Sequence, residues 1–287
     1  MKPVFLGAMN NRAILIVDDH AVDIETRSEG RFPSDPMAII ENWDAFCEWA
    51  RSVELTNEEP QVNAEDMQCP VPRPRAIYGI GLNYRDHAEE AKLDLPKQPM
   101  VFAKFPSCIA GPGAEIPLTS NRVDWEAELV VVIGRGGRNI PAEDAMSRIA
   151  GYSVGQDISD RRQQFADRPP QFCLGKSAAN FGPIGPSVVS TDAFENPNDL
   201  AVKCELNGQV VQSSSTANLI FSVSELVEFL SKWCELMPGD LIFTGTPAGV
   251  GSLRNPRRYL QDGDVLTTMI DGLGVLKNRC VSATGAT

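Results

Sequence analysis

The sequence predicts a β-rich mixed α/β fold, a sandwich or roll preceded by a small α+β unit. After residue 75, short apolar runs divided by glycine and proline follow one another, from AIYGIGLNY at residues 76–84 to GLGVLKNRC at residues 272–280. Only the stretches 86–92, 142–149 and 222–233 have the apolar spacing of helices. Many short strands with few helices favour a sandwich or roll over alternating βαβ units.

A small separate domain is predicted at the N-terminus. ILIVDD at residues 14–19 is typical of a strand, and a helix is expected to begin at Asp35 and Pro36, because aspartate can cap a helix and proline suits its first position. Apolar residues at helical spacing extend this one helix to Ala50. The polar, proline-containing stretch 57–75 is the expected boundary. The sequence therefore predicts a small domain over residues 1–70 and a larger one over residues 71–287.

Composition restricts the class of partner and the compartment. The 287 residues carry a formal net charge of -12, which argues against nucleic acid as a partner and suits cations. The seven cysteines are odd in number and form no CxxC pair, so we expect reduced thiols in a cytoplasmic protein rather than disulfides or a zinc ribbon. No signal peptide is expected, and no apolar run approaches the ~20 residues that span a membrane. We therefore expect a soluble protein without a membrane partner.

Two glutamates interrupt an apolar segment, VDWEAELVVVIG, that otherwise has the composition of a buried strand over residues 123–134. Because side chains alternate along a strand, Asp124, Glu126 and Glu128 are expected on one face. Burying unpaired carboxylates costs several kcal/mol. A hard cation that prefers oxygen ligands, such as Mg²⁺, Mn²⁺ or Ca²⁺, would neutralise them. The alternative is an edge strand whose polar face is solvated.

Asp157 and Lys176 are candidates for the same site. Asp157 ends the strand-like run GYSVGQD and could supply a third oxygen ligand, although an aspartate there could equally cap a turn. Lys176 lies in FCLGKSAANFG, an apolar and small-residue setting. Near a metal its ammonium could stabilise a developing enolate. Alternatively it is a surface lysine whose stem lies along apolar surface.

A possible base and its orienting carboxylate lie on the helix expected at residues 86–92. His87 and Glu90 are three positions apart, so they share a face and could hydrogen bond, unless the short charged helix is simply solvated. The loop TGTPAGVG at residues 244–251 follows an apolar strand. Its glycines could merely permit turns, or they could let backbone N–H groups and the Thr246 hydroxyl approach a carboxylate or oxyanion.

A serine hydrolase is excluded despite the G-x-S-x-G match at residues 151–155. In the α/β-hydrolase arrangement the histidine follows the serine along the chain. Both histidines, His20 and His87, precede Ser153. Ser153 is therefore expected to be an ordinary strand residue.

Taken together, these segments resemble the fumarylacetoacetate hydrolase family over roughly residues 75–281. The segments that resemble family blocks are GIGLNYRDHAEEA, VDWEAELVVVIG, GYSVGQDISDRRQ, LGKS, FGPIGP, LNGQVVQ, LMPGDLIFTGTPAGVG and DGDVLTTMIDGLGVLKN. The resemblance implies a mixed β-sandwich roll and a homodimer. It also implies a Mg²⁺ or Mn²⁺ ion held by Glu126, Glu128 and Asp157.

The same resemblance implies roles for six further residues. Lys176 matches a lysine that stabilises the carbanion or enolate, and His87 and Glu90 match a catalytic pair on a segment that orders as a lid. The positions that match substrate contacts are Arg161, Gln164 and Thr246.

The resemblance implies a metal-dependent hydrolase that cleaves a C–C bond of a small 2-oxo or 1,3-dicarbonyl acid, such as an acylpyruvate. Such a reaction passes through an enolate that a cation can stabilise. Decarboxylation of oxaloacetate, double-bond isomerisation and hydration of a 2-oxo-enoic acid share that enolate and stay open as alternatives. A protein that keeps the fold only for binding or as a scaffold is a further alternative.

Overall fold

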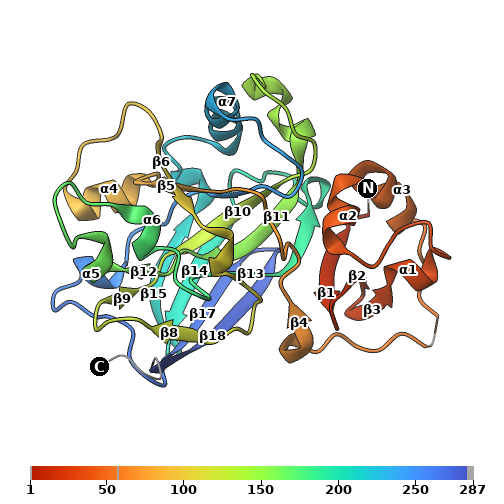
Figure 1. Ribbon diagram of the computed structural model, residues 1–287, viewed down its shortest axis with the longest axis horizontal. Helices are drawn as coiled ribbons and strands as arrows, with labels where there is room; N and C mark the ends of the chain where they lie inside the picture. The colour runs from red at the N-terminus through yellow and green to blue at the C-terminus, as the bar shows by residue number, and fades with distance from the viewer. Residues whose placement is uncertain (1, 57, 283–287) are drawn as a thin grey trace.

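The computed structural model describes residues 2–56 and 58–282, and the two larger β-sheets of this part pack against each other (Figure 1). In the large sheet the strands lie in the order β3 (His20–Asp23), β2 (Arg12–Val17), β1 (Phe5–Met9), β13 (Gly182–Ser190), β11 (Ile149–Gln156), β10 (Ala127–Ile133), β16 (Leu241–Phe243), β5 (Ile77–Gly81) and β6 (Met100–Lys104). Two short strands extend it, β4 (Met67–Gln68) beside β1 and β7 (Ile109–Ala110) beside β13.

The second sheet has the order β15 (Gln209–Ser215), β14 (Ala201–Leu206), β17 (Val265–Ile270), β18 (Gly274–Ser282) and β8 (Ile116–Leu118). A short ribbon joins β9 (Val123–Asp124) to β12 (Ser159–Asp160). Most neighbouring strands are antiparallel, and the β16–β5, β13–β7 and β18–β8 pairs are parallel. The β-rich mixed fold predicted from the sequence is confirmed.

The helices are short and lie around the sheets. They are α1 (Ile24–Arg27), α2 (Pro36–Glu41), α3 (Trp43–Ala50), α4 (Arg85–Ala91), α5 (Arg161–Gln164), α6 (Phe172–Gly175) and α7 (Val223–Trp233). The stretch Ala142–Arg148, expected to be α-helical, forms a 3-10 helix that packs against α7. Among the described residues, no helix combines the length and the apolar character that crossing a bilayer would require.

The helix expected from Pro36 to Ala50 is two helices, because the chain leaves the helical conformation at Asn42 (φ -119°, ψ 37°). Its predicted start is confirmed: the Asp35 side chain accepts a hydrogen bond from the Met37 N–H at 3.1 Å. Asparagine favours such breaks, since its amide competes for nearby backbone groups.

The N-terminal strands continue the large sheet instead of forming a sheet of their own. β1 pairs with β13 along Phe5 to Gly7, and Figure 1 shows the N-terminal part lying beside the main body. Buried apolar residues of both parts belong to one continuous core. The domain boundary at residue 70 stays a prediction. Asn57, the first residue of the expected linker, lies outside the described residues, as do residue 1 and residues 283–287.

The segment expected to be one strand over residues 123–134 is two strands with a break at Trp125 and Glu126. At the break, side-chain amides replace strand partners: Glu126 N–H donates to Gln156 Oε1 at 2.9 Å and Ala127 N–H donates to Gln212 Oε1 at 3.0 Å. The alternation that placed Asp124 beside the two glutamates is therefore wrong. The solvated-edge alternative is also wrong, because β10 is buried between β11 and β16.

The capping box of α7 gives a stability prediction. Ser222 Oγ accepts from the Glu225 N–H at 3.4 Å, and the Glu225 carboxylate accepts from the Ser222 N–H at 2.7 Å. Ser222→Ala should lower the free energy of unfolding by about 1 kcal/mol, the usual cost of losing an N-cap. Denaturant unfolding measures this, with Ser224→Ala in the same helix as the matched control. Equal values for the two variants would show that the cap contributes nothing.

Candidate active site

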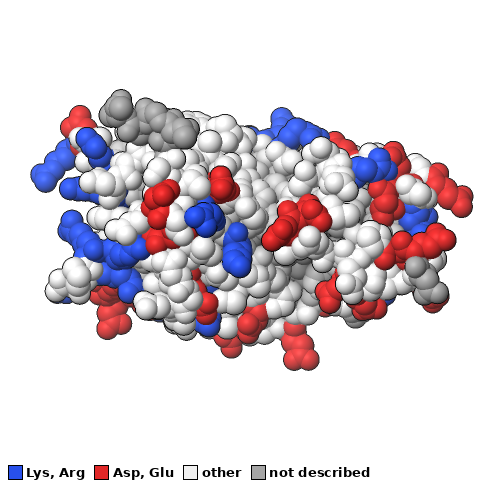
Figure 2. All heavy atoms as spheres, turned by 90° about the horizontal axis from the view of Figure 1, so that it is seen from below, with Lys and Arg blue, Asp and Glu red and all other residues white. Residues whose placement is uncertain are grey.

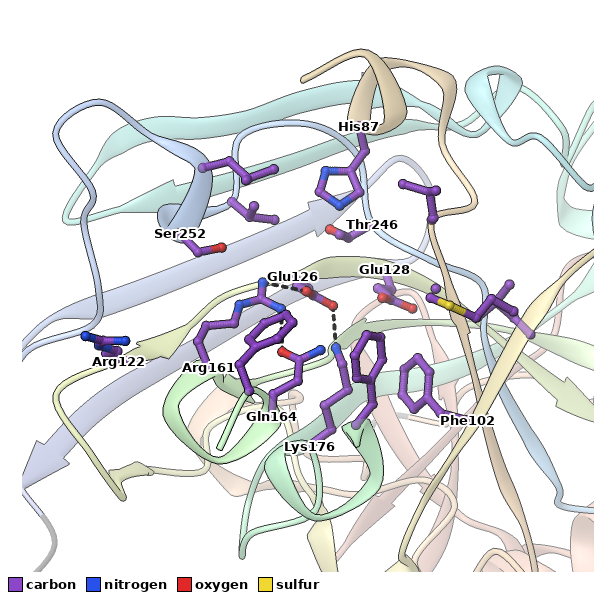
Figure 3. A pocket seen from close by; sticks show the side chains of 18 of the residues that line it. His87, Phe102, Arg122, Glu126, Glu128, Arg161, Gln164, Lys176, Thr246 and Ser252 are labelled. Carbon is purple, nitrogen blue, oxygen red and sulfur yellow. Dashed lines mark hydrogen bonds and ion pairs between the residues drawn. The ribbon is translucent and has the colours of Figure 1, made fainter. Parts of the chain in front are cut away.

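Three acidic residues meet where β10 and β11 run side by side. Glu126 lies in the break before β10, Glu128 lies on β10, and Asp157 directly follows β11. The Asp157 N–H donates to the Glu126 carbonyl at 2.9 Å, which fixes the two backbones together. One carboxylate oxygen from each residue lies within 4.8 Å of the other two, and all three residues are buried. The structure thus brings the three predicted ligands together (Figure 3).

The pKa values of Glu126 and Glu128 are shifted in opposite directions by their surroundings. Burial alone would raise the pKa of Glu126, but the ammonium of Lys176 and the guanidinium of Arg161 hold it at about 2. Glu128 is 1% exposed, and burial followed by the charges of Asp157 and Glu126 raises its pKa well above the usual range. Its hydrogen bond from the Gly245 N–H, at 2.8 Å, compensates only in part. The ionised form of Glu128 is therefore disfavoured in this arrangement of charges.

Lys176 lies inside this acidic cluster and is only 2% exposed, so it is not the surface lysine of the alternative interpretation. Its ammonium donates to Glu126 Oε2 at 2.7 Å, to Asp157 Oδ2 at 2.6 Å and to Ser159 Oγ at 2.8 Å. Burial opposes the charged form, yet the carboxylates of Asp157 and Glu126 outweigh it and raise the pKa of Lys176. The lysine is therefore held as a fixed positive charge.

A second buried lysine, Lys104 at the end of β6, was not predicted. Its ammonium donates to Asp157 Oδ1 at 2.6 Å, to the Phe181 carbonyl at 3.1 Å and to the Lys176 carbonyl. Asp157 therefore lies between two lysines. The signal was present in PMVFAKF, where a lysine ends an apolar run, just as an apolar setting singled out Lys176.

The predicted His87 and Glu90 pair forms on α4. His87 Nδ1 lies 3.1 Å from Glu90 Oε2, and Glu90 Oε1 accepts from the Gly249 N–H at 3.0 Å. Both side chains are largely buried, so the solvated-helix alternative does not hold. Figure 3 shows His87 projecting from its helix toward the carboxylates, with Lys176 on the opposite side. Glu90 thus fixes the imidazole ring against the glycine-rich loop.

The three predicted substrate contacts all line the same cavity, and each also forms a side-chain hydrogen bond within the protein. Arg161 donates to Asp124 Oδ2 at 2.9 Å, to Glu126 Oε1 at 2.6 Å and to Gln164 Oε1 at 3.0 Å. Thr246 donates its hydroxyl to the Ala127 carbonyl at 3.0 Å. Gln164 is left with its amide N–H groups for a ligand.

Asp124, which the sequence placed beside the metal ligands, organises the wall of the cavity instead. Its Oδ1 accepts from the Gly251 N–H at 2.7 Å, and its Oδ2 accepts from the Ser252 N–H at 3.0 Å as well as from Arg161. It therefore ties the loop after Gly249 to the acidic site.

One cavity of about 630 Å³ is lined by the predicted site residues His87, Glu126, Glu128, Arg161, Gln164, Lys176 and Thr246. Glu126, Glu128 and Lys176 lie on one side of it and His87 on another, while a wall of aromatic rings includes Phe102, Phe165 and Phe172. Phe172 contacts the other two rings with centroid distances of 5.8 and 6.1 Å.

Ser153, by contrast, is fully buried in β11, as expected of a strand residue.

The donor set fits a hard divalent cation. All three groups offer carboxylate oxygens, the ligands that Mg²⁺ and Mn²⁺ prefer. Burial and the charges of Asp157 and Glu126 disfavour the ionised form of Glu128 and raise its pKa, and a cation bound beside it would stabilise that form. Glu126, Glu128 and Asp157 are thus the residues that would hold the ion.

A cavity that combines a buried acidic cluster, a buried lysine and a histidine oriented by a carboxylate is typical of an enzyme. The family model described as fumarylacetoacetate (FAA) hydrolase C-terminal matches residues 76–281. The chain therefore belongs to the fumarylacetoacetate hydrolase family.

Two relatives and one solved structure show how far the similarity extends. Fumarylacetoacetate hydrolase domain-containing protein 2 homolog of Dictyostelium discoideum is 39% identical and covers 95% of this chain and 93% of its own length. The mitochondrial oxaloacetate tautomerase FAHD2A of Bos taurus is 44% identical over 88% of this chain and 82% of its own. A crystal structure from Mycobacterium smegmatis, assigned provisionally as HpcE, is 48% identical with a TM-score of 0.92, covering 98% of this chain and all of that one. Since the bovine relative is mitochondrial, a cytoplasmic location stays a prediction.

Proposed function

We propose that this protein catalyses the keto–enol tautomerisation of oxaloacetate or a similar 2-oxo dicarboxylic acid. The observation that carries the proposal is the position of His87 in the same cavity as Lys176 and the acidic cluster, on the opposite side of it (Figure 3). A substrate between them would meet a base on one side and positive charge on the other. The bovine tautomerase, at 44% identity, supports this reaction over the alternatives.

A Mg²⁺ or Mn²⁺ ion, with Ca²⁺ as a further option, would polarise the 2-oxo group and stabilise negative charge on its oxygen. The proton transfers and the remaining charge stabilisation are carried out by side chains of the protein. Glu90 engages His87 Nδ1, which leaves Nε2 to take a proton from the substrate C3. The electron pair of that C–H bond forms the C2–C3 double bond, and the carbonyl oxygen becomes an enolate. Lys176 stabilises this charge, and returning the proton to the oxygen gives the enol.

The proposal is tested by following the ultraviolet absorbance of the oxaloacetate enol with Mg²⁺ present. Wild-type protein should accelerate the interconversion, and His87→Asn should lower kcat by about 10² to 10⁴, the contribution typical of a general base. His20→Asn is the matched control, since His20 lies on β3 and contacts the Asp18 carbonyl. Equal activity of the His87 variant and the wild type would refute the assigned base.

The metal site has its own readout, which does not depend on turnover. Calorimetric titration should show Mg²⁺ or Mn²⁺ binding that Glu128→Gln weakens by at least about tenfold, because one charged ligand is lost. Glu205→Gln, on β14, removes the same charge away from the cavity. A protein that serves only as a scaffold need not bind either ion.

A second candidate is hydrolysis of a C–C bond in an acylpyruvate. It is favoured by the His87–Glu90 pair, which could equally activate a water molecule, and by a cavity of about 630 Å³. Release of pyruvate from an acylpyruvate would identify this reaction, and release of carbon dioxide from oxaloacetate would identify a decarboxylase. Assembly as a homodimer stays a prediction that sedimentation can test.

A further inference from the structure

The cavity has a second charged region, formed by Arg122 before β9 and Arg257 in the loop before β17. Among the described residues, neither guanidinium forms an ion pair with a carboxylate, whereas Arg161 in the same cavity pairs with both Asp124 and Glu126. Figure 3 shows Arg122 at the end of the cavity away from Lys176 and Phe102. The segment that carries Arg257 runs next to that of Arg122, because the Leu260 N–H donates to the Val123 carbonyl at 2.8 Å. Arg122, with this segment beside it, thus lies at the end away from Lys176.

The two arginines belong to a chain whose net charge is -12. Figure 2 shows lysine and arginine gathered at the end of the molecule that carries α5 and the loop before β17, while acidic residues predominate at the N-terminal end. Of the described residues that line the cavity, only Glu126 and Glu128 are acidic, and they belong to the other end. An anion entering this end would meet no opposing carboxylate.

The backbone of Arg122 is held by two hydrogen bonds, and that of Arg257 is held through its neighbour Arg258. The Arg122 carbonyl accepts from the Arg161 N–H at 2.9 Å, and the Arg122 N–H donates to Ser120 Oγ at 3.0 Å. Next to Arg257, the Arg258 N–H donates to the Gly251 carbonyl at 3.1 Å, and the Arg258 guanidinium binds both oxygens of Asp264, at 2.9 and 2.7 Å. A fixed backbone with an uncommitted guanidinium reduces the ordering cost of binding an anion.

We infer that Arg122 and Arg257 are specificity-determining residues that recognise a second anionic group on the substrate, distal to its 2-oxo acid end. This inference rests on the proposed function, in which the 2-oxo acid end lies at the acidic cluster. Apolar residues of the same cavity, including Phe165, Val250 and Leu253, would contact the connecting carbon chain.

The test compares diacids with monoacids of equal chain length, with Mg²⁺ present, by calorimetry. 2-Oxoglutarate, 2-oxoadipate and 2-oxopimelate are paired with 2-oxopentanoate, 2-oxohexanoate and 2-oxoheptanoate. Wild-type protein should bind at least one diacid about tenfold more tightly than its matched monoacid, as expected for charge-assisted hydrogen bonds at a partly solvated site. The preference should weaken as NaCl is raised, because exposed charges are screened.

The variant Arg122→Gln/Arg257→Gln should abolish this preference while leaving monoacid and oxalate binding unchanged. Arg162→Gln, on α5 but outside the cavity lining, is the matched control and should keep the preference. The inference would be overturned if wild-type protein showed no preference for a diacid over its matched monoacid at any chain length. It would also be overturned if the double variant kept that preference. Neither result would affect the proposed function. Failure of wild-type protein to bind oxalate or any 2-oxo acid would instead overturn the proposed function on which it rests.

Discussion

Lys176→Met should lower kcat for oxaloacetate tautomerisation by about 10² to 10³, the loss found when one preorganised donor is removed from a site of developing negative charge. The reason is the position of the ammonium, which is buried and held within 2.6 to 2.8 Å of Glu126, Asp157 and Ser159. Methionine has a similar volume but no charge, so the enolate oxygen would lose a partner that water cannot replace in a buried site.

The same variant should bind Mg²⁺ at least as tightly as the wild type, because the ammonium no longer competes for Glu126 and Asp157. Calorimetry therefore separates a folded but slow enzyme from an unfolded one. Lys97→Met removes an exposed lysine before β6 and should leave both kcat and metal affinity unchanged. A Lys176 variant with the kcat of the wild type would show that the lysine only balances the charge of the acidic cluster.

The spacing of residues along the sequence predicted the structure correctly where it depends on residues close together in the chain. Helix α7 begins after Ser222 and ends at Trp233, in agreement with the stretch 222–233 that its apolar spacing predicts. His87 and Glu90 meet because three positions on a helix bring side chains together. Glu126, Glu128 and Asp157 also converge, although that prediction drew on the family resemblance as well as on charge.

The spacing of residues along the sequence did not predict the structure where hydrogen-bond partners come from distant segments of the chain. Asp124 was assigned to the face of Glu126 and Glu128, but Gln156 and Gln212 bond the backbone between them and interrupt the strand. The apolar run around Lys104 indicated a buried lysine but not its partners, because its three acceptors lie 53, 72 and 77 residues away along the chain. No period of helix or strand encodes such contacts, since tertiary packing alone determines them.

Lys104→Met should lower the free energy of unfolding by about 3 to 5 kcal/mol, the usual cost of removing one partner from a buried ion pair. The ammonium is fully buried, as is the carboxylate of Asp157 that accepts from it at 2.6 Å. The variant would also leave the carbonyls of Lys176 and Phe181 without this donor. Because buried polar groups cost most when left unsatisfied, the loss should exceed that of an apolar truncation of similar size.

Denaturant unfolding, with the slope of the transition checked for two-state behaviour, measures this difference. The matched control is Lys203→Met, which removes a lysine whose ion pair with Glu205, at 2.6 Å, is partly exposed. That variant should change the free energy of unfolding by less than about 1 kcal/mol. If Lys104→Met costs no more than the control, Asp157 must obtain its compensation from Lys176 alone, and Lys104 would have no structural role in the acidic site.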